Sequence, residues 1–334
     1  MKSPITGKEM ILIKEKRTLS FRKEEFEVVY HSYKCEDSGE SFTTTQLDEL
    51  NLNQVYNQYR VKHNLPFPDE IMLIRKKYGL SAAKMSEVLG FGANVYRNYE
   101  TGEIPSQSNA RLIQLAKDPK EFKQLIGLGF DAEGKSPEKI YQKIDTIIQK
   151  EGDNFLNTQY EYYLLGKTRP NAYTGYRIPN LEKFREMVVF FTEKMQPWKT
   201  KLNKLMFYAD FGMFSKVGLS ISGAQYRAIS LGPVPDNYQS IYEFLEKNGD
   251  IEIHYTQFSD GGTGEQFKPN PQRKFNPTVF SDLELNELEE IAERFNKCKT
   301  GEIIDISHLE KAWIENQNRN GFIDFKYGFE LALV

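Results

Sequence analysis

The stretch from Gly79 to Ser106, GLSAAKMSEVLGFGANVYRNYETGEIPS, constrains the fold of this chain more than any other. Ser81 is a favourable helix N-cap residue, and Gly90 is placed to end the helix that begins there. A second short helix, residues 93–100, follows after a tight turn. Two short helices joined by about four residues that include glycine predict a helix-turn-helix.

Helical spacing divides residues 93–100 into two faces. Val95, Tyr96 and Tyr99 fall on the inward face, and the polar residues fall on the outward face. In a helix-turn-helix the second helix enters the major groove, where asparagine can read adenine and arginine can read guanine or hold phosphate. The predicted DNA-binding residues are Asn94, Arg97, Asn98, Lys76, Lys77 and Lys84. A helical hairpin that does not touch DNA is the alternative.

The same stretch resembles the Cro/repressor (XRE) family through the pattern GLS…LG…Y.NYE.G..P. The resemblance implies operator binding by the second helix. One position departs from the family, because Ala82 stands where that family usually has a glutamine that contacts phosphate and base. An alanine side chain cannot hydrogen-bond, so a chain whose DNA affinity is modest or lost is a second alternative.

Residues 1–44 alternate apolar and polar side chains between turn residues, which predicts a small β-rich module. The segments SPITG (residues 3–7) and YKCEDSGE (residues 33–40) have the outline of the two knuckles of a zinc ribbon. The four ligand positions are occupied by Ser3, Thr6, Cys35 and Ser38. A structural zinc site needs four cysteine or histidine ligands, so we predict a module without metal. We interpret His31 as an exposed strand residue.

This module, the helix expected from Thr45 and the helix-turn-helix together resemble the MqsA/YgiT-type antitoxins over residues 1 to about 125. In that family the N-terminal module holds zinc, and the following domain dimerises and binds the operator. The resemblance therefore implies a homodimer that binds operator DNA. Farther on, a helix opened by Ser136-Pro137 is expected to carry Ile140, Ile144, Ile147 and Ile148 on one face.

The C-terminal half has the pattern of a second, mainly helical core. A heptad-like apolar stripe runs through Leu181, Phe184, Val188, Phe191 and Met195. The segment KLNKLMFYADFGMF is apolar nearly all round, which predicts a buried central helix. IEIHYTQF and QFKPN, separated by a glycine-rich turn, predict a β-hairpin. Capping boxes are expected at Ser281–Glu284 and Ser307–Glu310, and a rigid turn at 232–235.

Three separated motifs of this half, KLNKLMFYADFGMFSKVGLSISG, YRAISLGPVPDNYQSIYEFL and DISHLEKAW, resemble the Panacea (SocA-like) antitoxin domain over about residues 180–320. In that family the domain binds and neutralises a cognate toxin. We expect toxin contact through exposed side chains of a lysine face and of the turn. The candidate toxin-binding residues are Lys201, Lys204, Pro233, Pro235, Asp236 and Tyr238. For the two lysines, side chains that are merely solvated are the alternative.

Composition limits the remaining possibilities. With 334 residues, 39% hydrophobic and 27% charged, the chain has the composition of a soluble globular protein. We expect no membrane span or signal peptide, and two distant cysteines make no disulfide framework. Residues 69–117 carry seven Lys/Arg and five Asp/Glu, and residues 178–334 carry 18 and 23, so the two regions are expected to meet different partners. Four histidines without a metal-ligand motif or a phosphate loop predict a chain that is not an enzyme and needs no cofactor.

These observations predict an α+β, mainly α, chain of four parts. They are a degenerate zinc-ribbon-like module plus helix (1–64), a helix-turn-helix (65–126), a linker with one amphipathic helix (127–179) and a helical Panacea-like domain with a β-hairpin (180–334). We expect a cytoplasmic type II antitoxin that binds a cognate toxin and autoregulates its operon. The alternative is a helix-turn-helix transcriptional regulator whose C-terminal domain senses a ligand or oligomerises.

Overall fold

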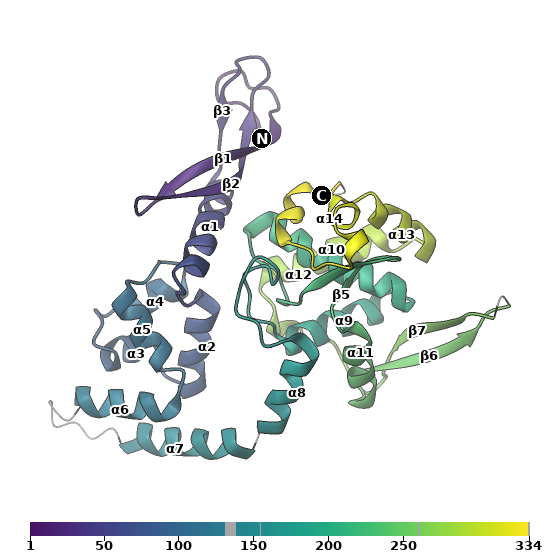
Figure 1. Ribbon diagram of the computed structural model, residues 1–334. Coiled ribbons are helices and arrows are strands. Elements are labelled where there is room, and N and C mark those ends of the chain that lie inside the picture. The colour runs from purple at the N-terminus through teal and green to yellow at the C-terminus, as the bar shows by residue number, and fades with distance from the viewer. Residues whose placement is uncertain (131–137, 154, 260, 333–334) are drawn as a thin grey trace. The chain divides into compact units, whose positions relative to one another are not determined.

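The computed structural model describes residues 1–130, 138–153, 155–259 and 261–332 and divides into two compact units (Figure 1). Residues 1–55 and 163–334 form the larger unit, and residues 56–162 form the smaller unit. Helices predominate in both, and the sheets are small and antiparallel. The predicted α+β, mainly α class is therefore confirmed.

The N-terminal module of the larger unit is a three-stranded antiparallel sheet. Its strands are β1 (Ile11–Phe21), β2 (Glu24–Lys34) and β3 (Ser41–Phe42), in the order β1-β2-β3. Strands β1 and β2 pair along their whole length, from Ile11 opposite Lys34 to Phe21 opposite Glu24. A two-residue turn joins them, with φ of 48° at Arg22 and 67° at Lys23. Positive φ at both central residues is the geometry that matches the twist of paired strands.

Helix α1 (Thr45–Lys62) is held against β2 by two amide side chains. Gln54 accepts the N–H of Val29 at 2.9 Å and donates to the Val29 carbonyl at 2.8 Å. Asn51 exchanges the same pair of hydrogen bonds with the backbone of His31, at 2.8 and 3.0 Å. These amides therefore satisfy backbone groups of β2 that would otherwise be buried without partners.

The rest of the larger unit is built around α10 (Lys199–Val217), in which every side chain from Lys201 to Phe214 is buried. The predicted central helix is therefore confirmed. The other helices are α9 (Leu181–Met195), α11 (Tyr238–Lys247), α12 (Asp282–Phe295), α13 (Thr300–His308) and α14 (Lys311–Ile314). Two hairpins, β4 (Tyr226–Ile229) with β5 (Gly232–Pro235) and β6 (Ile251–Gln257) with β7 (Thr263–Pro269), complete it, with short 3-10 turns at Pro277–Val279, Gln317–Arg319 and Phe325–Glu330.

Of the two predicted capping boxes, one is present in the structure and the other is not. The capping box at α12 is present, because the Glu284 carboxylate accepts the Ser281 N–H at 2.8 Å and the Ser281 hydroxyl accepts the Glu284 N–H. The box expected at Ser307–Glu310 is wrong. Ser307 lies inside α13 and donates to the Ile304 carbonyl at 2.8 Å, and Glu310 precedes α14. A serine inside a helix can bond its own helix instead of capping the next one.

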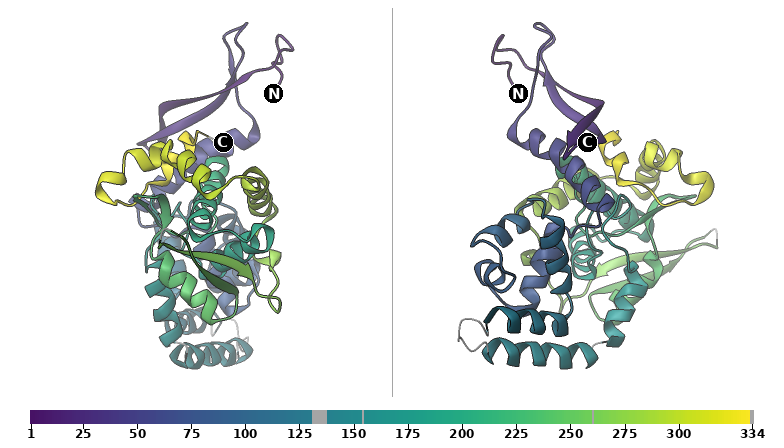
Figure 2. Two further views of the ribbon diagram at one scale, coloured as in Figure 1. Left: turned by 90° about the vertical axis from the view of Figure 1, so that its right-hand side faces the viewer. Right: turned by 60° about the vertical axis from the view of Figure 1, so that its left-hand side comes forward.

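The smaller unit is built mainly of short helices. They are the end of α1, α2 (Pro68–Tyr78), α3 (Ala82–Val88), α4 (Val95–Glu100), α5 (Gln107–Leu115), α6 (Pro119–Phe130), α7 (Glu138–Asp153) and most of α8 (Phe155–Leu165). Helices α6 and α7 lie side by side (Figures 1 and 2). Ile144 of α7 is fully buried in the helix-turn-helix core, so the range expected as a linker supplies part of that core. The expected Ser136-Pro137 start lies outside the described residues. No helix in the described ranges is long and apolar enough to span a bilayer.

Candidate functional sites

The helix-turn-helix is fixed by hydrogen bonds between its helices. The Ser81 hydroxyl accepts the Lys84 N–H at 3.1 Å and caps α3, as predicted. The buried Ser86 hydroxyl accepts the Tyr96 N–H at 3.0 Å and so joins α3 to the start of α4. The Tyr96 hydroxyl donates to the Ile71 carbonyl at 2.7 Å and joins α4 to α2. The orientation of α4 is therefore set by buried polar contacts as well as by apolar packing.

The outward face of α4 carries the three polar residues that helical spacing placed there. Asn94, Arg97 and Asn98 are exposed, and Tyr96 and Tyr99 are buried. Asn94 is the N-cap position, so the polar face begins at the N-terminal end of the helix. This is the end at which helix-turn-helix proteins contact base edges.

The three lysines predicted to contact DNA beside this face differ in whether they already have a partner within the smaller unit. Lys76 is exposed at the end of α2. The Lys77 ammonium donates to the Lys117 carbonyl at 2.8 Å, and the Lys84 ammonium lies 2.8 Å from the Glu87 carboxylate. Each of these two lysines already serves a partner within the smaller unit. A phosphate contact by either would have to share or replace that partner.

Two residues of the helix-turn-helix, Glu100 and Ala82, have surroundings that the sequence did not predict. Arg75 donates twice to the Glu100 carboxylate, at 2.6 and 3.1 Å, which neutralises the acidic residue at the end of α4. Ala82 is half-buried against the core formed by α2, α3 and α4. The missing glutamine at position 82 is thus replaced by a small side chain that packs instead of facing outward.

The two knuckle turns of the N-terminal module keep their backbone geometry. Gly7 donates its N–H to the Ser3 carbonyl at 2.9 Å, and Gly39 donates to the Cys35 carbonyl at 2.8 Å. Their φ angles are 70° and 74°, in the left-handed region that glycine adopts without steric cost. The glycines are therefore required by the turns themselves, whether or not a metal is bound.

The four former ligand positions form a hydrogen-bonded cluster that does not fit zinc. The Thr6 hydroxyl lies 3.3 Å from the Cys35 sulfur, and the Ser3 hydroxyl accepts the Thr6 N–H at 3.2 Å. Hydrogen bonds from Ser38, Thr6 and Ser3 lower the pKa of the buried Cys35 thiol to about 6. Hydroxyl groups thus stabilise the thiolate by hydrogen bonding. One thiolate and three neutral hydroxyls are not the donor set of a structural zinc site.

His31, expected to be exposed, is 2% exposed, and that expectation is wrong. Its Nδ1 lies 2.8 Å from the Val29 carbonyl, and its ring packs edge-on against Phe329 at 5.1 Å between centroids. Burial lowers the pKa of His31 and favours the neutral imidazole. The side chain is part of the packing of β2.

We predict that chelation leaves the N-terminal module folded. Ser3, Thr6 and Ser38 replace the metal with hydrogen bonds, so EDTA should not change amide exchange in β1 and β2. Hydrogen exchange with and without EDTA, together with elemental analysis, checks this. One zinc per chain, combined with loss of protection in both strands on chelation, would contradict it.

The lysines expected on an exposed face of the larger unit are both buried, which corrects that expectation. Lys204 is fully buried, and its ammonium donates to the Pro233 carbonyl at 2.9 Å. Lys201 is 8% exposed and donates to the Phe295 and Cys298 carbonyls at 2.8 and 2.6 Å. Burial lowers the pKa of both, that of Lys204 to about 7. The two side chains therefore join elements of the core.

The segment expected as a rigid turn is strand β5, and Pro233 and Pro235 are buried in it. Gly232 has a φ of 97°, and a Cβ added there would lie 2.7 Å from Lys204 Cε. A larger residue would therefore push β5 away from α10. Among the candidate toxin-binding residues of this segment, Asp236 and Tyr238 keep partial exposure. The Asp236 carboxylate pairs with Arg227 at 2.6 Å.

A buried carboxylate that sequence inspection missed organises the loop after α10. Asp210 accepts four hydrogen bonds, from the N–H groups of Ile221 and Ser222 at 2.7 and 2.8 Å and from the Ser222 and Tyr226 hydroxyls at 2.5 and 2.7 Å. Burial raises the pKa of Asp210, and the four hydrogen bonds oppose that shift. An acidic residue inside an otherwise apolar helix was the signal that could have revealed it.

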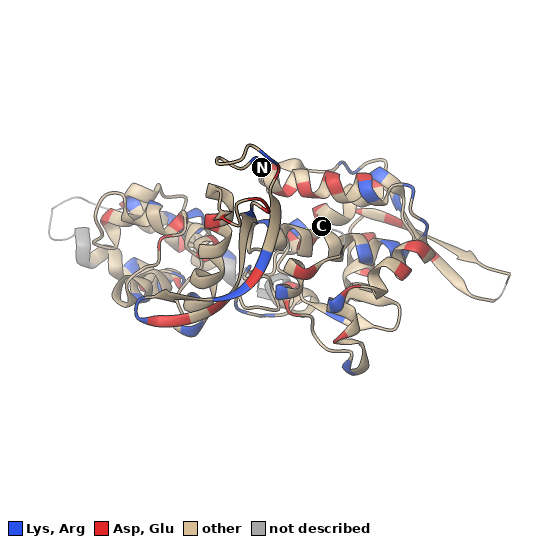
Figure 3. Ribbon diagram, turned by 90° about the horizontal axis from the view of Figure 1, so that it is seen from above, with Lys and Arg blue, Asp and Glu red and all other residues tan. Residues whose placement is uncertain are grey.

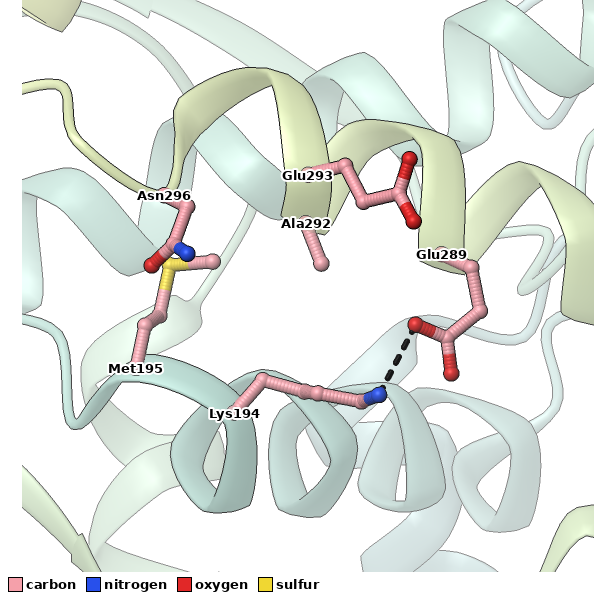
Figure 4. A pocket seen from close by; sticks show the side chains of 6 residues that line it. All are labelled: Lys194, Met195, Glu289, Ala292, Glu293 and Asn296. Atoms are coloured by element: carbon pink, nitrogen blue, oxygen red, sulfur yellow. Dashed lines mark ion pairs between the residues drawn. The ribbon is translucent and has the colours of Figure 1, made fainter.

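A small polar pocket lies between the end of α9 and α12 (Figure 4). Its volume is about 180 Å³, and an ion pair of 2.9 Å between Lys194 and Glu289 closes one side. Met195 and Ala292 supply its apolar part. Pockets for metabolites commonly measure about 300–1,000 Å³, so this pocket is small for such a ligand.

Comparisons with known families match two separate regions of the chain. Residues 1–125 match the family described as the antitoxin component of a bacterial toxin-antitoxin system, MqsA. Residues 202–314 match the family described as antitoxin SocA-like, Panacea domain. No curated protein matches the chain. Both families are antitoxins, so the matches support an antitoxin role and confirm the two resemblances inferred from the motifs. The chain thus joins a region that is similar to MqsA antitoxins to a region that is similar to the SocA-like Panacea domain.

Proposed function

We propose that this protein is a type II antitoxin of the bacterial cytoplasm. Its C-terminal domain, residues 180–334, binds a cognate toxin directly, and its helix-turn-helix binds the operator of the shared operon as a homodimer. The observation that carries the proposal is the presence of two antitoxin-family regions on one chain, at 1–125 and 202–314. A chain built in this way can couple toxin neutralisation to repression.

The exposed face of α4 supports the DNA-binding part of the proposal. Asn94, Arg97 and Asn98 extend outward from a helix whose other face is anchored by Tyr96 and Tyr99. An arginine that contacts guanine through two hydrogen bonds contributes sequence specificity, and lysines that contact phosphate contribute affinity without specificity. Lys76 is suited to the second role because it is exposed near the same helices.

Replacing Arg97 by alanine should lower operator affinity by about 1–3 kcal/mol if the side chain reads a base. Lys76→Ala, in contrast, should weaken binding to all DNA sequences alike and reduce the salt dependence. Fluorescence anisotropy with operator and unrelated duplexes, at several salt concentrations, measures both effects.

Because both side chains are exposed, the melting temperature should not change in either variant. Operator binding that survives the triple replacement of Asn94, Arg97 and Asn98 by alanine would show that α4 is not the recognition helix.

Co-expression with the neighbouring reading frame tests the proposed function as a whole. The full chain should rescue growth from the toxin encoded beside it and should co-purify with that toxin. The triple alanine variant of α4 should still rescue growth but should no longer repress the operon, because its changes lie in the smaller unit. A folded, soluble chain that neither rescues growth nor co-purifies with the neighbouring product would refute the proposal.

A further inference from the structure

The β6–β7 hairpin extends from the core of the larger unit with one edge open (Figures 1 and 3). Near its base, Ile251, Ile253 and Phe267 are buried. Farther along, the side chain of Tyr255 is 62% exposed and that of Phe258 is 44% exposed. In Figure 3 the outer part of the hairpin carries no charged residue in its described part. Beyond the Tyr255–Glu265 pair, the described part of the hairpin therefore presents aromatic and uncharged polar side chains.

The two edges of this hairpin differ. On the β7 side, Phe267 donates its N–H to the Pro197 carbonyl at 2.9 Å, and Trp198 forms a bridge with Gln266. The Phe258 and Trp198 rings pack where a side chain on Gly264 would be, because a Cβ there would lie 2.6 Å from Phe258 and 2.7 Å from Trp198. This edge is covered near the base and the hairpin is anchored there.

The β6 edge is open from Tyr255 to Gln257. The Ile253 N–H points away from β7, because it donates to the Glu246 carboxylate of α11 at 3.2 Å. Backbone groups alternate along a strand, so those of Tyr255 and Gln257 point the same way. The N–H of Phe258, the next residue after Gln257, points to the other side and donates to the Gly262 carbonyl. Within the described residues, the backbone of Tyr255 and Gln257 has no hydrogen-bond partner on that outer side.

Sheet edges of this kind are usually protected by a charge, a proline or a bulge. Positions Tyr255, Thr256 and Gln257 provide none of these. A two-stranded hairpin is also marginally stable alone, so a third strand would stabilise it.

Three carboxylates lie on the β6 and α11 side of the open edge, whereas Glu265 of β7 is paired with Lys199. Glu243 is exposed on α11, Glu246 lies beside β6, and Glu252 is exposed near the base of the strand. Desolvation, together with the charges of Glu246, Glu265 and Glu243, raises the pKa of Tyr255. A strand added here would therefore lie next to carboxylates, which complement lysine and arginine side chains.

We infer that the edge of β6 at Tyr255–Gln257 binds an extended, basic segment of the toxin as a third strand. Main-chain hydrogen bonds would supply affinity, and the carboxylates of α11 would select the basic side chains. This inference rests on the proposed function, because it names the contact surface for the toxin.

A matched pair of variants at one residue tests the edge. Gln257→Pro removes the outward N–H without removing a β6–β7 hydrogen bond, and Gln257→Ala keeps that N–H. Calorimetric titration of the full chain with the purified toxin should show binding about tenfold weaker, or worse, for Gln257→Pro and nearly unchanged for Gln257→Ala. Glu243→Lys should also weaken binding, whereas Glu293→Lys on α12, an equal change of charge, should not.

Amide hydrogen exchange tests the same edge of β6 in the natural chain, without any substitution. The amides of Tyr255 and Gln257 should exchange quickly in the free chain and slowly in the toxin complex. Those of His254 and Thr256, which face β7, should be protected in both states.

Three outcomes separate the possibilities. Failure of the natural chain to bind the neighbouring toxin refutes the proposed function and this inference with it. Toxin binding that is equally tight in Gln257→Pro, with no added protection at Tyr255 and Gln257, refutes the inference alone. Loss of self-association in Gln257→Pro, seen by sedimentation while toxin affinity stays unchanged, would assign the edge to a second copy of this chain instead.

Discussion

Replacement of Asp210 by alanine should lower the free energy of unfolding of the larger unit by about 3–5 kcal/mol. Asp210 is fully buried and accepts hydrogen bonds from two backbone N–H groups and two hydroxyls of residues 221–226. Its removal leaves the two N–H groups and the Ser222 hydroxyl buried without this acceptor, and each such donor costs about 1–3 kcal/mol. The Tyr226 hydroxyl can still donate to the Met206 carbonyl at 2.9 Å. The loop after α10 should lose its fixed conformation first.

Urea unfolding followed by tryptophan fluorescence measures this effect in the larger unit alone. Both tryptophans of the chain, Trp198 and Trp313, belong to that unit. Asp305→Ala on α13 is a matched control, because it removes an exposed carboxylate and should change stability by about 0.5 kcal/mol or less. Equal stability of Asp210→Ala and the natural chain would show that the four hydrogen bonds do not hold this loop.

Lys204→Glu should destabilise the larger unit by about 3–5 kcal/mol, because it places a carboxylate against the Pro233 carbonyl at a fully buried position. Lys204→Met, which keeps the length of the side chain without a charge, should cost less, about 1–3 kcal/mol, because it leaves the Pro233 carbonyl without its donor. The same fluorescence measurement compares the two. A glutamate variant as stable as the methionine variant would mean that position 204 is accessible to solvent.

The pH dependence of stability gives an independent check on Lys204. Its pKa is lowered by burial to about 7, below the value near 10.4 of an unfolded lysine. Between these values the unfolded chain binds more protons, so the free energy of unfolding rises with pH. From pH 7 to pH 9 the natural chain should gain about 2 kcal/mol relative to Lys204→Met, in which this group is absent. An equal pH dependence in both chains would place the pKa of Lys204 near its ordinary value.

Sequence patterns were enough to predict the features that depend on neighbours within one or two helical turns. The N-cap at Ser81, the capping box at Ser281–Glu284 and the exposed face at Asn94, Arg97 and Asn98 follow from helical geometry and local hydrogen bonds. Local pattern also predicted the buried helix α10 and the β6–β7 hairpin. The motif patterns were sufficient to recognise both matched families.

The environment of polar side chains whose partners are distant in the sequence follows from the packing of the fold and not from local patterns. Lys204 is buried because the carbonyl of Pro233, 29 residues away, accepts its hydrogen bond, and Lys201 reaches a carbonyl 94 residues away. Asn51, 20 residues away, likewise satisfies the backbone beside His31. A lysine or histidine is exposed by default because burying its polar atoms is costly, and it can be buried only where the fold supplies a partner. That partner is set by chain packing, which local periodicity does not specify.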